Sequence, residues 1–134
     1  MFDELSPTDV YHALTENENS LLLDCRTRAE WVYVGIPDIR LTKAQLALIE
    51  WTDITGQQNL NFVNQCGEQA STDTAIFVIC RSGARSAAAC MSLVQNGFEN
   101  VCNVSEGFEG DLDNQNHRSR VNGWKYHKLP WHQR

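Results

Sequence analysis

The stretch from Ala75 to Gly97, AIFVICRSGARSAAACMSLVQNG, decides the fold. Its first six residues form a short, continuous apolar run, which is typical of a strand buried on both faces. Residues 86–96 are rich in alanine and other good helix formers, and Gly97 stands at a C-cap position. A further apolar run follows at Val101–Val104. Together these segments predict a βαβ unit whose first strand leads through a tight loop into the helix.

The remaining chain extends this pattern of buried strands and helices. Ser20–Asp24 is another short apolar run that ends in a polar residue. We also expect helices starting at Ser6-Pro7 and ending near Glu16, and over residues 27–34 and 59–69, a possible strand over 47–51, and a long exposed loop over 111–120. This alternation predicts an α/β fold with a mainly parallel central sheet and helices on both faces, formed by residues 1–134 as a single domain.

Composition excludes several classes of protein. The chain has 134 residues, a net charge of −6 and 42% hydrophobic residues. An acidic body disfavours nucleic acid as a partner, and no apolar run approaches the roughly 18 residues of a membrane span. The first ten residues carry three acids and no apolar stretch, so we expect no secretory signal and a cytoplasmic location. The five cysteines are therefore expected to be thiols, and because none forms a C-x-x-C pair we expect no metal site.

The loop between the strand and the helix contains the candidate chemistry. Cys80 leaves the buried strand and is followed by Arg81, Ser82, Gly83, Ala84 and Arg85. Backbone N–H groups at a helix N-terminus, the helix dipole and two guanidinium groups all stabilise an anion, so we expect them to favour the Cys80 thiolate. Gly83 permits positive φ, and the small Ala84 keeps the ring of amides open.

The length of this loop separates two enzyme classes. Four residues lie between Cys80 and Arg85. Cysteine phosphatases encircle a tetrahedral phosphate with a loop one residue longer, so a phosphate-ester or arsenate hydrolase is disfavoured. The smaller ring suits one additional sulfur atom on the cysteine.

The loop resembles the active-site loop of the rhodanese (sulfurtransferase) family, and the resemblance covers nearly the whole chain. The segment with Asp24, Arg26, Glu30 and Trp31 is similar to the N-terminal signature of that family. Further similarities follow in the same order at Ile36-Pro37, at Gly97-Phe98, and at Gly107, Gly110 and Trp124. The histidine that often precedes Ile-Pro in the family is absent, and the closing glycine pair is interrupted, so we expect the local loop and the substrate mouth to differ in shape from those typical of the family.

The resemblance implies a sulfurtransferase without a cofactor. Cys80 would take the outer sulfur of thiosulfate or another persulfide donor and pass it to cyanide, to a thiol or to a sulfur-relay protein partner. Arg85 and Arg81 would attract the anionic donor, with Arg85 the better candidate, unless one of them pairs with Asp24 or Glu30 as scaffold. Ser82, Gly83 and Ala84 would contribute backbone N–H groups. The alternative is a rhodanese-like module that binds a partner or senses persulfide with negligible turnover.

Other residues are assigned supporting or structural roles. Asp24 and Arg26 are expected to position the loop rather than to react, and Glu30 is expected to pair with Arg26 or Arg28 at helical spacing. Cys25 could approach Cys80 and resolve a persulfide as a disulfide. The remaining cysteines are expected to be buried and inert: Cys66, Cys90 and Cys102.

Overall fold

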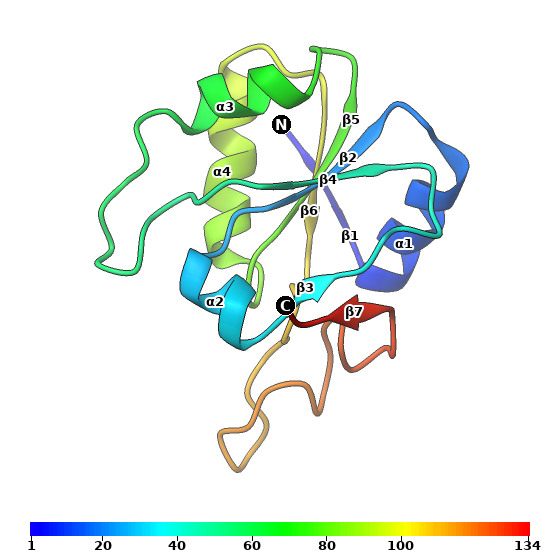
Figure 1. Ribbon diagram of the computed structural model, residues 1–134, viewed down its shortest axis with the longest axis vertical. Coiled ribbons are helices and arrows are strands. Elements are labelled where there is room, and N and C mark those ends of the chain that lie inside the picture. The colour runs from blue at the N-terminus through cyan, green and yellow to red at the C-terminus, as the bar shows by residue number, and fades with distance from the viewer.

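A central parallel sheet organises the chain, as the computed structural model of residues 1–134 shows (Figure 1). Its five strands are arranged in the order β1-β6-β5-β2-β4, and every neighbouring pair is parallel. The bounds are Asp3–Leu5 for β1, Ser20–Asp24 for β2, Gln45–Leu48 for β4, Ala75–Ile79 for β5 and Asn100–Val104 for β6. The predicted α/β class with a mainly parallel sheet is confirmed.

Helices cover both faces of this sheet (Figure 1). On one face lies α1 (Pro7–Glu16), which Ser6 caps through its side chain. On the other face lie α3 (Phe62–Gln69) and α4 (Ala84–Gln95). The short α2 (Arg28–Tyr33) follows β2 and starts with a capping box between Thr27 and Glu30. None of the helices combines the length and the apolar character that crossing a membrane requires.

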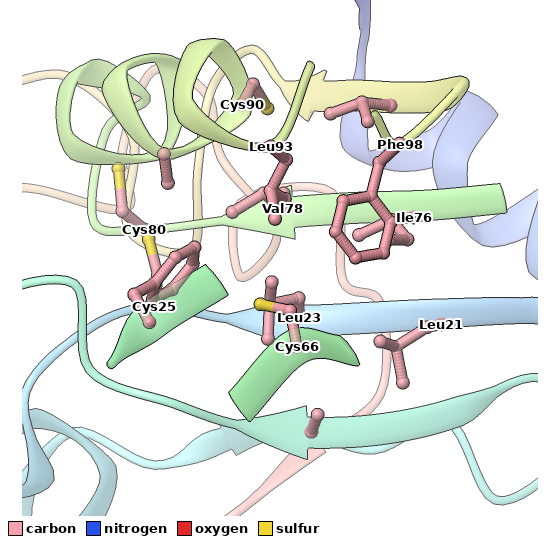
Figure 2. Close-up of a cluster of buried hydrophobic side chains, with 14 residues drawn as sticks. Leu21, Leu23, Cys25, Cys66, Ile76, Val78, Cys80, Cys90, Leu93 and Phe98 are labelled. Carbon is pink, nitrogen blue, oxygen red and sulfur yellow. The ribbon is translucent and has the colours of Figure 1, made fainter. Parts of the chain in front are cut away.

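Alternation along β5 divides the interior into two cores. Ile76, Val78 and Cys80 point toward α3 and α4 in one cluster, drawn in Figure 2, whereas Phe77 and Ile79 point to the opposite cluster. The opposite cluster also contains Val10 and Leu14 of α1, and Phe108 and Trp124 of the C-terminal segment. Both faces of β5 are therefore buried, as its uninterrupted apolar sequence predicts.

Several boundaries differ from those expected. The strand expected over 47–51 is β4 at Gln45–Leu48, and the helix expected from residue 59 begins at Phe62. Asn59 lies in irregular chain ahead of the helix, where its Nδ2 donates to the Glu50 carbonyl oxygen at 2.7 Å. The short β1 was not expected, nor was the antiparallel pair of β3 (Ile36–Pro37) and β7 (Trp131–His132).

The C-terminal segment returns to the edge of the sheet where the parallel strands end. Residues 111–120 contain no helix or strand, as predicted, and Asp113 organises them by accepting bonds from the Gln115 and His117 N–H groups at 2.9 Å each. Trp124 then packs into the core, and its Nε1 donates to the Pro130 carbonyl oxygen at 2.8 Å. The packing of Trp124 and the bonds within residues 111–120 hold the C-terminal segment against the end of the sheet.

Candidate active site

The carboxyl ends of β2 and β5 bring the predicted site residues together. Asp24 is the last residue of β2 and is in register with Ile79, the last residue of β5. Cys80 follows directly, and Gly83 caps the start of α4. This edge is where open parallel sheets place their ligand sites.

Cys80 is held in a ring of hydrogen-bond donors. Its Sγ accepts from the Gly83 N–H at 3.1 Å and from the Ser86 N–H at 3.3 Å, and the Ser86 Oγ lies 3.1 Å from the same sulfur. The residue is only 1% exposed. Backbone amides at the start of α4 thus point at the sulfur, which is an arrangement that stabilises sulfur-centred anions. Ser86 was not among the expected site residues, although its place in the first turn of the helix was the available signal.

Gly83 is required at its position for two reasons. Its φ is 110°, and a β-carbon there would lie 2.5 Å from the Ser105 carbonyl oxygen. Its own carbonyl oxygen accepts from Asn103 Nδ2 at 3.2 Å and from Ser86 Oγ at 3.2 Å. Asn103 was also missed, and the signal was a polar amide inside an otherwise apolar strand.

The turn at residues 107–110 supports the loop by donating hydrogen bonds to its carbonyl oxygens. The Phe108 N–H donates to the Cys80 carbonyl oxygen at 2.8 Å, and the Glu109 N–H donates to the Arg81 carbonyl oxygen at 2.9 Å. Gly107 packs against Arg81 so closely that a β-carbon would lie 2.5 Å from the Arg81 carbonyl oxygen. Of the amides in the loop and the first turn of α4, those of Gly83 and Ser86 donate to the Cys80 sulfur, whereas those of Ser82 and Ala84, which were also expected to contribute, do not.

Arg85 makes a bidentate ion pair with Glu30. Its NH1 and NH2 donate to the two carboxylate oxygens at 2.7 and 2.9 Å, and the side chains are 27% and 19% exposed. Burial alone would raise the pKa of Glu30, but hydrogen bonds from Arg85 and Thr27 outweigh it and lower the pKa to about 2. The expected pairing of Glu30 with Arg26 or Arg28 is wrong, because Arg26 precedes α2 and bonds elsewhere.

Arg26 instead pairs with Asp24 inside the protein. Its Nε and NH2 donate to the two carboxylate oxygens at 3.0 and 2.7 Å, and both side chains are fully buried. The same NH2 donates to the Gly35 carbonyl oxygen at 2.7 Å, and the guanidinium carbon lies 4.2 Å from the centre of the Phe108 ring. The pair therefore ties β2 to the segment that supports the loop.

An open groove of about 540 Å³ lies beside the loop that follows Cys80. Arg81 and Arg85 line it on the loop side, and Arg81 is exposed. The opposite wall is formed by α2 and by the segment after β4, with Thr27, Ala29, Glu30, Tyr33, Val34, Thr52, Asp53, Ile54 and Gly56. The paired arginine is thus Arg85, whereas Arg81 keeps its guanidinium at the surface.

All five cysteines are buried free thiols. Burial raises the pKa of Cys66 and of Cys102 to about 12 each, and no hydrogen bond reaches the sulfur of Cys66 in the way that two amides reach Cys80. No cluster of three or more His, Cys, Asp or Glu side chains is placed to hold a metal ion.

Known proteins resemble this chain along its whole length. It is 36% identical to an uncharacterized protein of Rickettsia prowazekii, covering 98% of each chain, and 28% identical to a protein of Allochromatium vinosum named sulfurtransferase, covering 97% of this chain and 94% of that one. Among solved structures, Rv0390 from M. tuberculosis has a TM-score of 0.92 at 32% identity and full coverage of both chains.

A more distant structure identifies the type of fold. The rhodanese-like domain protein from Staphylococcus aureus has a TM-score of 0.59 at 19% identity, covering 79% of this chain and 87% of that one. The family model described as the STR4 middle domain matches residues 2–134. The chain therefore belongs to the STR4 middle domain family and has a rhodanese-like fold.

Proposed function

We propose that this protein is a sulfurtransferase that carries a sulfane sulfur on Cys80. The observation that carries the proposal is the Cys80 sulfur, which accepts from the Gly83 and Ser86 N–H groups at the start of α4. The similarity to the Allochromatium vinosum protein named sulfurtransferase supports the same reaction class. The donor is thiosulfate or a persulfide, and the acceptor is cyanide, a thiol or a sulfur-relay protein.

The reaction needs no side-chain base, because the loop amides stabilise Cys80 as the thiolate. The Cys80 thiolate attacks the outer sulfur of thiosulfate, the S–S bond of the donor breaks, and sulfite leaves with the bonding electron pair. The acceptor then attacks the outer sulfur of the Cys80 persulfide, and the thiolate is the leaving group. Both the thiolate and the persulfide are anions, so the amides of Gly83 and Ser86 stabilise the enzyme before and after the first transfer.

The two arginines have different parts in this proposal. Arg81 is exposed at the groove and attracts the anionic donor. Arg85 is held by Glu30, and the hydrogen bond between them is the main reason that the pKa of Arg85 is raised. The charge of Cys80 raises the same pKa to a smaller extent, so the two groups interact. Arg85 therefore supplies a fixed positive charge where sulfite departs.

One assay tests the proposal on the intact protein. Thiocyanate formation from thiosulfate and cyanide is measured for the wild type and for Cys80→Ser, and the intact mass is determined after thiosulfate treatment. We expect the wild type to turn over and to gain one sulfur atom, and Cys80→Ser to do neither. Cys66→Ser is the matched control, because Cys66 is buried in the same core without amide donors at its sulfur.

The outcomes separate the rival functions. Full activity of Cys80→Ser would remove Cys80 from the reaction, and a wild type with neither turnover nor added sulfur would refute the proposal. A stable added sulfur without turnover would instead identify a persulfide-sensing module.

A further inference from the structure

Cys25 is a second buried thiol that the proposed sulfur transfer does not use. It follows β2 as Cys80 follows β5, and its N–H donates to the Ile79 carbonyl oxygen at 3.0 Å. The parallel register ends with Asp24 beside Ile79, and Cys25 and Cys80 are the residues that directly follow these two. The two cysteines are thus direct neighbours across the ends of adjacent strands.

Their side chains also lie on the same face of the sheet. Leu21, Leu23 and Cys25 of one strand, and Ile76, Val78 and Cys80 of the other, all belong to the core cluster under α3 and α4. Figure 2 shows Cys25 and Cys80 next to one another where the strands end. Neighbouring strands are about 4.8 Å apart. Such a spacing falls within the Cα separation of roughly 4.4–6.8 Å that a disulfide bridges.

The environment of Cys25 differs from that of Cys80. Burial raises the pKa of Cys25 well above its ordinary value, and the nearby Cys80 and Asp24 raise it further. Its sulfur therefore rests as a protonated thiol and does not compete for an external sulfur donor. It lies beside Cys80, whose sulfur takes the donor sulfur in the proposed function.

We propose that Cys25 is the resolving thiol of Cys80. This inference rests on the proposed function for its co-reactant, the Cys80 persulfide. The Cys25 sulfur attacks Sγ of Cys80, the bond between Sγ and the outer sulfur breaks, and the outer sulfur leaves with the electron pair. The proton of the Cys25 thiol goes to that sulfur, so the products are a Cys25–Cys80 disulfide and HS⁻. A dithiol then reduces the disulfide and is itself oxidised to a cyclic disulfide, which restores both cysteine thiols and makes a dithiol the reductant of this branch.

Cys90 is the competing partner within the same cluster. Cys90 lies on α4. Burial has the largest effect in raising its pKa, Cys102 and Glu4 have smaller effects, and Cys80 has the smallest. It is not in strand register with Cys80. Cys90→Ala is therefore the matched control for Cys25→Ala.

Mass spectrometry of the full chain tests this step. The protein is treated with thiosulfate, thiols are blocked, released sulfide is measured, and disulfides are mapped by peptide analysis without reduction. We expect the wild type and Cys90→Ala to gain one sulfur atom first and then, in the absence of an acceptor, to convert this persulfide into a Cys25–Cys80 disulfide with release of one sulfide per chain. Cys25→Ala and Cys25→Ser are expected to retain the Cys80 persulfide and to release none.

A second reagent separates this inference from the proposed function. Hydrogen peroxide oxidises the Cys80 thiolate to a sulfenic acid, which condenses with the Cys25 thiol to the same disulfide and water. That disulfide, formed by a protein that takes no sulfur from thiosulfate, would refute sulfur transfer and support the role of Cys25. A wild-type persulfide as long-lived as that of Cys25→Ala, or a bridge from Cys80 to Cys90, would overturn the inference.

Discussion

Two bidentate arginine–carboxylate pairs lie at the same edge of the sheet and differ in what they join. Asp24 and Arg26 are two residues apart and have no exposed side-chain surface. Glu30 and Arg85 are 55 residues apart, and their side chains are 19% and 27% exposed at the groove. The two charges of the buried pair come from one segment, and Arg26 anchors that segment to Gly35 and Phe108, whereas the half-buried pair itself joins α2 to the first turn of α4. Similar ion pairs thus serve the scaffold in one place and the site mouth in the other.

Arg26→Met is expected to have the largest effect on stability. It leaves the Asp24 carboxylate buried without its partner, and removing one member of a buried pair lowers the free energy of unfolding by about 3–5 kcal/mol. The variant also loses the bond to the Gly35 carbonyl oxygen and the contact with the Phe108 ring. Urea unfolding of the wild type and the variant measures the difference.

The double variant Asp24→Leu/Arg26→Met provides the control for this interpretation. An apolar replacement of both partners leaves no unpaired charge, so it should be more stable than Arg26→Met alone. If the double variant unfolds at the same or lower urea concentration, the unpaired carboxylate is not the cause of the loss.

Glu30→Gln is expected to have an intermediate effect that depends on pH. The pKa of Glu30 is about 2 in the folded protein and 4.5 without the fold. Since the folded pKa is the lower one, the unfolded state binds more protons between these values. The stabilisation is therefore complete above pH 4.5 and disappears as the pH falls toward 2.

Unfolding measured across this pH range tests the Glu30 prediction. The wild type should lose stability more steeply than Glu30→Gln between pH 4.5 and 2. At neutral pH we expect the variant to be less stable by roughly 1–2 kcal/mol, which is less than the whole pKa shift implies because water screens a partly exposed pair. Parallel curves for the two proteins would show that the pair makes no such contribution.

Features with a local sequence signal were predictable, whereas contacts that only the tertiary fold creates were not. The βαβ unit around Cys80 was predictable because two continuous apolar runs flank a loop and a helix, and each signal is local. The short β3 and β7 were not, since two residues of strand contain no periodicity. Asn103 and Ser86 support the loop through contacts that depend on how α4 folds back over β5 and β6.

The ion pairs show the same limit at the level of side chains. Helical spacing suggested Arg26 or Arg28 for Glu30, but Arg26 lies before the N-cap residue Thr27 and bonds to Asp24. The actual partner of Glu30 is Arg85, and only the tertiary fold brings them together. A pairing across 55 residues leaves no trace in local spacing.

Arg40→Ala is expected to have the smallest effect and completes the series. Arg40 pairs with Asp38 at 2.7 Å, and side-chain and backbone hydrogen bonds from Arg40 lower the pKa of Asp38 to about 2. The Arg40 side chain is nevertheless 79% exposed, so water and salt screen the attraction, and holding a long side chain in place opposes it. The urea midpoint of Arg40→Ala should therefore match that of the wild type, in low salt and in high salt alike. A loss comparable to that of Arg26→Met would mean that burial is not what distinguishes the pairs of this protein.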